Sequence, residues 1–315
     1  MTTAPLELLP IDLAPYRRGN VGIDYVHRFD SGRDGPRVMV NALTHGNELC
    51  GAYALARLLD DGIRPRRGSL TVSFANVAAY ERFDVANPTA SRFIDEDFNR
   101  LWSDAILAGP RHSAELDRAR ALRPLVAEAD LLLDIHSMHA DGPALMLCGI
   151  AEKGVKLARK LGAPAFIVAD RGHDAGPRMR DYGAFSDPAL PAAALLVECG
   201  QHWRAETRAI AFDTLFRFLA AAGTVSAEQA APYCSVPPPD RQRLIEVTEV
   251  ITIATDDFRF SERYAGLEVV ATAGTVIASD GDRAITTPYD DCVLVMPAQR
   301  LRRGQTAVRL GRLVD

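Results

Sequence analysis

A histidine and a glutamate three residues apart could act together on one metal ion. His45 and Glu48 lie between an apolar run of strand type at residues 38–43 and a helical pattern that begins at Leu49. At such a strand-to-helix turn both side chains can converge, and an imidazole nitrogen with a carboxylate oxygen suits Zn²⁺. In an isolated motif this short, the histidine more often caps the helix and the glutamate occupies its first turn. A catalytic zinc site therefore requires a third ligand elsewhere.

The third ligand is expected at His136, which ends the nearly continuous apolar run of residues 129–136. Such a run is typical of a central strand that is buried on both faces. In doubly wound sheets, ligands bind beyond the carboxyl ends of the parallel strands, so His136 and His45 can reach the same rim. A hydrogen-bonded core histidine is the alternative, but His45 and Glu48 together favour one Zn²⁺ per chain. Asp134, two residues earlier, could orient a ligand or cap a neighbouring strand.

A base for hydrolysis is expected at Glu198, a carboxylate at the end of the apolar run of residues 193–197. A carboxylate in such a position is costly to bury unless it is paired or functional. Its alternative role is an ion pair with an arginine of the polar segment at residues 78–112.

That polar segment contains two arginines and an asparagine, Arg92, Asn99 and Arg100. Guanidinium groups stay charged and bind carboxylates and developing oxyanions with two parallel hydrogen bonds. Taken alone, the arginines are equally typical of ion-pair partners for the acidic residues 95–97. The aromatic residues of the segment (Phe93, Phe98 and Trp102) favour an ordered, packed loop.

The elements that must position these residues alternate between strand and helix, which predicts a three-layer α/β/α domain. A helix is expected from about Ser113, interrupted at Pro124, and another at residues 205–222. Strands are expected at 38–43, 70–77, 129–136, 165–169 and 193–197.

A proline cluster at residues 237–239 marks the expected end of this domain. Short β-type runs punctuated by glycine follow it. We therefore expect a catalytic domain at residues 1–235 and a smaller, mostly β domain at residues 236–315.

Composition and charge argue against several functional classes of protein. The 315 residues carry a net charge of −5 and no long basic run, which argues against nucleic-acid binding. No apolar run approaches the roughly 18 residues of a membrane span, and no signal-peptide pattern is visible, so we expect a cytoplasmic protein. The five cysteines are dispersed, which argues against a disulfide framework or a cysteine zinc site. The sequence is compatible with a homo-oligomer.

Four motifs in register resemble those of the aspartoacylase and succinylglutamate desuccinylase family, whose catalytic fold is zinc carboxypeptidase-like. Residues 44–51 (Thr-His-Gly-Asn-Glu-Leu-Cys-Gly) resemble its H-G-N-E-x-x-G zinc motif. Residues 92–100 resemble its R-x-I-D-x-D-L-N-R motif, with Phe98 in place of leucine. Residues 134–136 (Asp-Ile-His) and 198–200 (Glu-Cys-Gly) resemble its D-L-H and E-x-G motifs.

The resemblance implies roles for the first group of residues. His45, Glu48 and His136 would bind zinc. Glu198 would act as general base on the metal-activated water and then deliver the proton to the leaving amine.

It also implies how the substrate is held. Arg92 would polarise the scissile carbonyl and stabilise the oxyanion, and Asn99 and Arg100 would hold a substrate carboxylate. Aspartoacylases carry a further carboxylate-binding arginine about ten residues before the catalytic glutamate, where this sequence has none. Arg178 and Arg180 lie further upstream and are candidates to replace it.

The implied activity is hydrolysis of the amide bond of a small N-acyl amino acid, with that small molecule as the partner. A zinc carboxypeptidase or peptide amidase of the same fold is the alternative. A non-catalytic metal- or carboxylate-binding protein is a third hypothesis. Three further histidines (His139, His173 and His202) could line the cleft, although ordinary rim positions explain them more simply.

Overall fold

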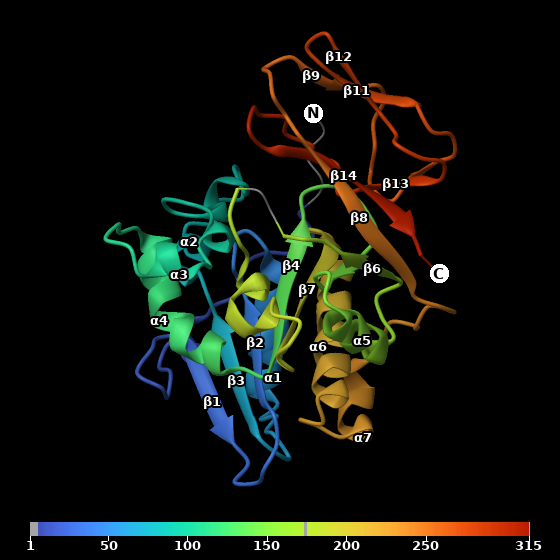
Figure 1. The fold of residues 1–315 in the computed structure, drawn as a ribbon. Helices are drawn as coiled ribbons and strands as arrows, with labels where there is room; N and C mark the ends of the chain where they lie inside the picture. The colour runs from blue at the N-terminus through green and yellow to red at the C-terminus, as the bar shows by residue number, and fades with distance from the viewer. Residues whose placement is uncertain (1–5, 173–174, 315) are drawn as a thin grey trace.

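An eleven-stranded mixed sheet forms the centre of the molecule in the computed structural model, which describes residues 6–172 and 175–314 (Figure 1). The strand order across it is β1 (Val26–Asp30), β3 (Ser69–Phe74), β2 (Arg37–Ala42), β4 (Leu131–Met138), β7 (Ala193–Gln201), β5 (Leu145–Leu147), β6 (Phe166–Ala169), β8 (Arg243–Thr252), β14 (Thr306–Leu313), β13 (Cys292–Val295) and β10 (Val269–Val270).

The four central strands, β3, β2, β4 and β7, run parallel, as the apolar runs of the sequence predict. Their register places Asn41 opposite Asp134 and His136 opposite Glu198. The carboxyl ends of β2, β4 and β7 therefore meet at one edge, which is the physical reason that His45, His136 and Glu198, 62 to 153 positions apart in sequence, can share a site.

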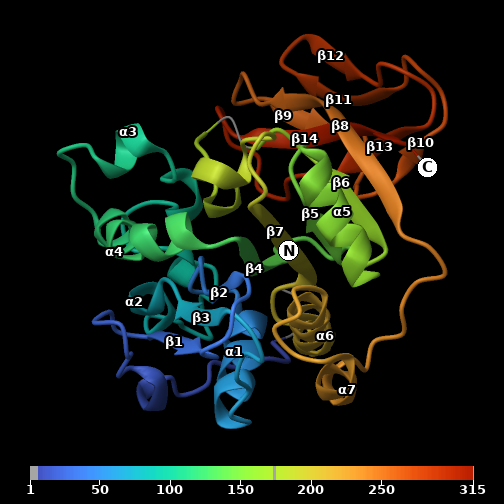
Figure 2. The same cartoon turned by 60° about the horizontal axis from the view of Figure 1, so that its bottom comes forward.

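Helices cover both faces of this sheet, which gives the expected three layers (Figure 2). Leu133 of β4 packs in the core shared with α1, α5 and α6, whereas the neighbouring Leu132 packs against α4. Successive side chains of a strand point to opposite faces, so both layers bury apolar residues from the same run. The helices are α1 (Leu49–Asp60), α2 (Val77–Tyr80), α3 (Asp104–Leu107), α4 (Ala114–Glu128), α5 (Glu152–Leu161), α6 (Glu206–Ala221) and α7 (Ala227–Ala230).

The expected interruption at Pro124 is wrong, because α4 continues through this proline to Glu128. A proline inside a helix removes one backbone hydrogen bond. Here Leu122 and Val126, on either side of it, are fully buried in the core beneath α4. Burial of this helix face offsets the lost bond, a tertiary effect that local sequence does not reveal.

The polar segment at residues 78–112 is ordered by its own buried residues. Phe98 and Trp102 are buried and pack against each other with ring centroids 5.7 Å apart. Phe93, by contrast, is 38% exposed. The segment is thus a packed loop, as expected, although not all of its aromatic residues point inward.

The C-terminal strands extend the central sheet beyond the proline cluster. β8 pairs in parallel with β6, and β14, β13 and β10 follow it. A second sheet of three strands, β9 (Phe258–Phe260), β11 (Val276–Asp280) and β12 (Arg283–Thr286), lies above them in Figure 1. Within the described ranges, no helix has both the length and the apolar character that crossing a bilayer requires.

Candidate metal centre

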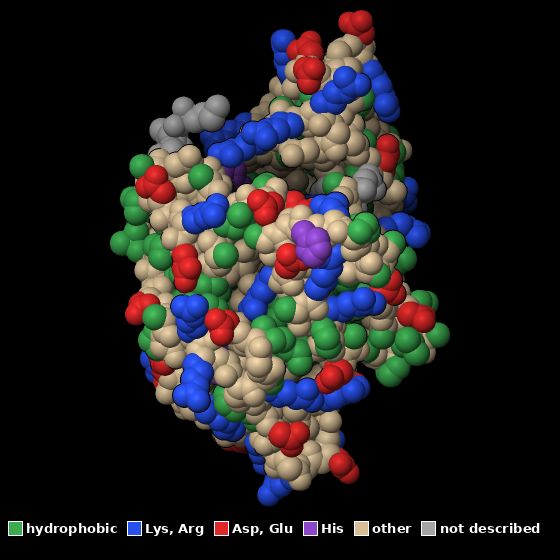
Figure 3. All heavy atoms as spheres, turned by 90° about the vertical axis from the view of Figure 1, so that its left-hand side faces the viewer, with side chains coloured by type: hydrophobic (Ala, Val, Ile, Leu, Met, Phe, Trp, Pro, Cys, Tyr) green, Lys and Arg blue, Asp and Glu red, His purple; other side chains and the backbone are tan. Residues whose placement is uncertain are grey.

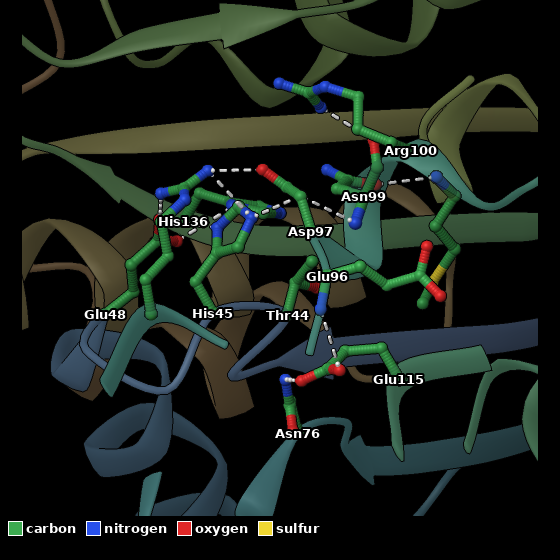
Figure 4. A network of polar contacts seen from close by, with 12 residues as sticks. Thr44, His45, Glu48, Asn76, Glu96, Asp97, Asn99, Arg100, Glu115 and His136 are labelled. Atoms are coloured by element: carbon green, nitrogen blue, oxygen red, sulfur yellow. Dashed lines mark hydrogen bonds and ion pairs between the residues drawn. The ribbon is translucent and has the colours of Figure 1, made fainter. Parts of the chain in front are cut away.

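The side chains of His45, Glu48 and His136 converge on one point at the edge where β2 and β4 end (Figure 4). His45 Nδ1 lies 2.7 Å from Glu48 Oε1, and His136 Nδ1 lies 2.8 Å from Glu48 Oε2. One ligand atom from each residue lies within 4.8 Å of the others. All three are at most 4% exposed. Two imidazoles and a carboxylate in this arrangement are a donor set that suits Zn²⁺.

The turn that aims His45 requires unusual backbone geometry. Leu43, directly after β2, has a φ of 57°, a left-handed conformation that is uncommon for a residue other than glycine. Gly46 then lies so close to α2 that an added Cβ would be 2.4 Å from the backbone nitrogen of Tyr80. The chain can therefore pass between the strand end and α2 only with glycine at this position.

Each histidine presents Nδ1 to the site and holds Nε2 against another carboxylate. His136 Nε2 lies 2.7 Å from Asp134 Oδ2, and His45 Nε2 lies 2.9 Å from Asp97 Oδ1. Carboxylates that hold the second nitrogen fix the ring orientation and raise the basicity of the nitrogen that binds metal. Of the two roles left open for Asp134, the structure shows contact with His136.

Electrostatics favour a cation at this point. Burial alone would raise the pKa of Glu48, but His45 and His136 outweigh burial and hold that pKa well below its usual value. Burial alone would lower the pKa of His136, yet Asp134 and Glu48 raise it well above normal. Three carboxylates thus surround two imidazoles, a cluster whose negative charge a divalent ion would balance.

Glu198 lies in the last half of β7, which continues to Gln201, where it pairs with His136 of β4 and lines the same cavity. Its Oε2 is buried, and no described residue gives it a hydrogen bond. Burial raises the pKa of Glu198 to about 8. The charge of His136 opposes this rise, and the charge of Glu48 adds to it. No ion pair joins Glu198 to an arginine within the described ranges, so the alternative of a loop salt bridge is not what the structure contains.

Arg92 reaches the metal centre from the packed loop. Its Nη2 donates to Asp97 Oδ2 at 3.0 Å, and its Nη1 lies 3.5 Å from Glu48 Oε1. Burial would lower the pKa of Arg92, but Asp97 and Glu48 raise it. The pairing with Asp97 that sequence alone suggested is therefore present, but beside His45 rather than on an open surface.

The loop that carries Arg92 is anchored by one buried carboxylate, Glu115 of α4 (Figure 4). Glu115 accepts hydrogen bonds from the backbone N–H groups of Ile94, Asp95 and Glu96 at 2.6, 3.0 and 3.3 Å. It also accepts one from Asn76 Nδ2 at 2.9 Å. Four donors on one fully buried carboxylate fix the loop relative to the sheet.

Asn99 and Arg100 follow this anchor and line the cavity. Asn99 Oδ1 accepts from the backbone N–H of Met179 at 2.8 Å, which leaves its amide hydrogens available to a ligand. Arg100 Nη1 donates to the backbone oxygen of Asn99 at 2.7 Å. Burial lowers the pKa of Arg100 to about 10. Asp97 opposes this shift, whereas the nearby Arg178 and Arg92 lower the pKa further.

Arg178 and Arg180 share the buried carboxylate of Asp170. Arg178 Nη1 donates to its Oδ2 at 2.8 Å, and Arg180 Nη2 donates to its Oδ1 at 2.6 Å. Arg178 lines the cavity, whereas Arg180 is not among its lining residues. Arg180 Nη2 also lies 2.8 Å from Asp181 Oδ1. The two candidates for the missing arginine thus differ, and only Arg178 faces the space in which a substrate would bind.

The cavity has a volume of about 230 Å³, and the C-terminal strands and their loops form part of its wall. Residues 265–267 and 296–299 line it, together with Thr306 and Arg309 of β14. Figure 3 shows a hollow between the C-terminal strands at the top and the body below, with Lys and Arg side chains along its upper edge.

Two of the three further histidines line this cavity. His202 is buried with Nδ1 2.8 Å from Ser137 Oγ, and burial lowers its pKa to about 3. His139 lies next to it, with ring centroids 5.6 Å apart. The expectation of an ordinary rim position is therefore wrong for His202, which is buried inside the cavity wall. His173 lies outside the described residues.

Three residues of the site were not singled out from sequence: Glu115, Asp170 and Arg309. Asp97 was expected as an ion-pair partner of the arginines, but its contact with His45 was not. Asp97 lies in the R-x-I-D-x-D motif, which was the signal that could have identified it. Asp170 follows directly after the apolar run 165–169, a strand end like that of Glu198. Glu115 and Arg309 carry no local signal, since an acidic residue in a first helical turn and an arginine in a β-strand are both common.

Comparison with known proteins agrees with this geometry. Residues 34–221 match the family model described as succinylglutamate desuccinylase/aspartoacylase catalytic domain. The chain is 29% identical over 134 residues to a protein of Rattus norvegicus described as N-acyl-aromatic-L-amino acid amidohydrolase (carboxylate-forming). A Xenopus laevis protein of the same description is 33% identical over 110 residues. These matches cover 38% and 32% of this chain, and 39% and 34% of the relatives' own length.

Solved structures share the fold along nearly the whole chain. A succinylglutamate desuccinylase from Vibrio parahaemolyticus superimposes with a TM-score of 0.65 at 17% identity, covering 93% of this chain and 87% of that one. Murine aminoacylase 3 superimposes with a TM-score of 0.58 at 17% identity, and the match covers 90% of this chain and 97% of that one. At such identities the likeness concerns the fold, whereas the family model matches more than half of the sequence. The chain therefore belongs to the succinylglutamate desuccinylase/aspartoacylase family.

Proposed function

We propose that the protein is a zinc-dependent amidohydrolase that cleaves the amide bond of a small N-acyl amino acid. One observation carries the proposal. The His45, Glu48 and His136 donor set lies beside Glu198, a buried carboxylate with an oxygen that no described residue hydrogen-bonds. Zn²⁺ bound there would polarise an acyl carbonyl and lower the pKa of a water molecule.

The chain's own residues would perform the proton transfers. Glu198 would accept a proton from the attacking water and deliver it to the nitrogen of the leaving amine. Arg92 would donate hydrogen bonds to the acyl oxygen as negative charge develops on it. The amide of Asn99 and the guanidinium of Arg100 would hold a substrate carboxylate.

The size of the cavity favours a small substrate over a peptide. The C-terminal segments at residues 265–267 and 296–299 contribute to its wall, and Arg300 Nη2 donates to Thr89 Oγ1 of the polar loop at 3.0 Å. A carboxypeptidase needs a groove that accommodates the rest of a chain. The two-part organisation, with a catalytic domain at residues 1–235 and a β domain at 236–315, stays part of this proposal.

The test is release of free amine from N-acetyl and N-succinyl amino acids, compared with release from short peptides. We expect hydrolysis of one or more acyl amino acids, loss of activity after chelation, and recovery with Zn²⁺. Glu198→Gln should retain zinc and lose at least about 10²-fold in kcat, the low end for a proton-transfer residue. Full activity of that variant, or purified protein without stoichiometric metal-binding capacity, would refute the mechanism.

A further inference from the structure

The cavity beside the metal triad also contains a second pair of imidazoles, His139 and His202, to which the proposed reaction gives no role. Their ring centroids are 5.6 Å apart, close to the 5.3 Å between His45 and His136, the two histidines of the metal triad. Two imidazoles that bind one tetrahedral ion lie at about this spacing, because each metal–nitrogen bond is only about 2.0–2.1 Å long. The second pair is therefore spaced to share an ion.

The backbone at His202 is fixed to the strand that carries the metal ligand His136. The pairing of β4 with β7 shifts in register just after His136 and Glu198, and Gly200 lies in this irregular stretch with a φ of 107°. A bulge of this kind redirects the side chains that follow it. The His202 N–H then donates to the Met138 carbonyl at 2.8 Å. The position of His202 is thus set by β4.

The ring of His202 is held in one orientation. Its Nδ1 lies 2.8 Å from Ser137 Oγ, and its Nε2 has no hydrogen-bond partner within the described residues. Nε2 is therefore the nitrogen that a ligand in the cavity could use. A polar group on the other ring nitrogen orients an imidazole toward a metal, as the carboxylates do in the metal triad.

One indole packs against both rings of the pair. Trp203 is buried, and its ring centroid lies 5.5 Å from that of His202 and 6.1 Å from that of His139. His139 is exposed, so this contact is what holds its ring beside its partner. The two imidazoles are thereby arranged before any ligand binds, which lowers the entropy that binding would cost.

Both imidazoles are neutral near pH 7, the state in which a ring nitrogen can bind metal. Burial lowers the pKa of His202 to about 3. Burial also lowers the pKa of His139, and the nearby charges of Arg300 and Arg92 lower it further. These two guanidinium groups disfavour a cation, and no carboxylate belongs to the pair. An ion would therefore bind here more weakly than at the metal triad.

We propose that His139 and His202 form a second, weaker site for a divalent transition-metal ion such as Zn²⁺, which blocks the cavity when it is occupied. Imidazole nitrogen suits Zn²⁺, whereas Mg²⁺ prefers oxygen ligands. Within the described ranges, no third His, Cys, Asp or Glu ligand joins the pair, so water molecules would complete the coordination. Inhibition of hydrolysis by excess zinc rests on the proposed function, but binding of the second ion does not.

The test uses protein loaded with one equivalent of Zn²⁺, freed of unbound metal and then titrated calorimetrically with more Zn²⁺. We expect the wild-type protein to bind a second, weaker ion and to show no binding of Mg²⁺. His139→Phe, which keeps an aromatic ring against Trp203, should retain the first ion and lose the second. His202→Asn, which keeps a polar group for Ser137 but removes Nε2, should do the same.

His112→Phe is the matched control, because His112 is also exposed but lies 2.9 Å from a carboxylate, that of Asp117, rather than beside a second imidazole. This variant should bind both ions. In hydrolysis assays, the zinc concentration that gives half inhibition should rise at least about 10-fold in His139→Phe, since loss of a group that merely orients a ligand already weakens metal binding by that factor.

The outcomes separate the second site from the proposed function. Protein that does not retain the first equivalent of zinc refutes the metal triad and with it the proposed function. Retention of the first ion without binding of a second overturns the inference. A second ion that His139→Phe binds as tightly as wild type does would be adventitious surface binding only, which overturns it as well. If His202→Asn does not fold, the exposed position of His139 keeps the test intact.

Discussion

His136 Nε2 lies 2.7 Å from Oδ2 of Asp134, two residues earlier on β4. Residues i and i+2 of a strand point to the same face, so the strand itself brings this carboxylate and this imidazole together. The other oxygen of Asp134 accepts hydrogen bonds from Asn41 Nδ2 at 2.7 Å and Thr44 Oγ1 at 2.9 Å. The carboxylate is therefore fixed from β2, and it fixes the histidine in turn.

Asp134→Asn should weaken Zn²⁺ binding about 10- to 100-fold, because an amide holds the His136 ring less firmly and makes it less basic. Competition with a zinc chelator of known affinity measures the change. Asp24→Asn, which alters an exposed ion pair with Arg17, serves as the control. Zinc affinity that is the same in both variants would show that Asp134 does not act through the ligand.

Arg92→Lys should lower kcat by about 10²- to 10³-fold, as loss of an oxyanion donor does in other hydrolases. A lysine keeps the charge beside Asp97 and Glu48 but cannot reproduce the two-nitrogen contact. Zinc content should stay near one ion per chain, since Arg92 is not a ligand. Steady-state kinetics with metal analysis of the same sample separate these effects, and an unchanged kcat would contradict the role.

Glu115→Ala should destabilise the protein by about 2–4 kcal/mol, because it leaves three partly buried backbone N–H groups and the buried amide of Asn76 without an acceptor. The amides of Ile94, Asp95 and Glu96 should exchange with solvent faster, and activity should fall as the loop with Arg92 loosens. Urea unfolding and hydrogen exchange measure the two effects. Glu128→Ala is the control, because Glu128 lies on the same helix in a half-exposed ion pair with Arg28. It should lower the free energy of unfolding by less than about 1 kcal/mol.

Asp170→Asn should reduce stability by about 3–5 kcal/mol at neutral pH, because buried arginines lose their counter-charge. Burial would raise the pKa of Asp170, but Arg178, Arg180 and Arg309 hold it far below its usual value. A depressed folded-state pKa gives stability that is fully present above the unfolded-state value, near 4, and lost as pH falls below it.

The stability difference between wild type and Asp170→Asn should therefore be constant from pH 7 to about pH 5 and shrink progressively below pH 4. Urea unfolding at a series of pH values measures this difference. A difference that grows toward low pH would mean that the folded-state pKa of Asp170 is raised rather than lowered.

The sequence was sufficient for the central parallel strands and for the family. Apolar runs predicted β2, β4 and β7 because strands that are buried on both faces must be apolar along their length. The glycine-containing turn after β2 and the polar residues at three strand ends predicted the metal triad and Glu198. The match of residues 34–221 confirms the resemblance that these motifs suggested.

Local sequence failed where tertiary packing outweighs local preference. Pro124 is a helix breaker by itself, yet α4 continues because its apolar face is buried in the core. The histidine partner Asp97 and the loop anchor Glu115 act across contacts between residues far apart in sequence, which periodicity does not encode.

By itself, the sequence determined which residues could bind a metal and activate water, because those roles depend on residue type and on position at a strand end. Only the tertiary structure decided the charges around the cavity. β8 adds the C-terminal strands to the edge of the catalytic sheet, and β14 thereby brings Arg309 to a carboxylate 139 positions earlier in the chain. The energy of a buried charge depends on its neighbours in space, and the fold, rather than local pattern, sets those neighbours.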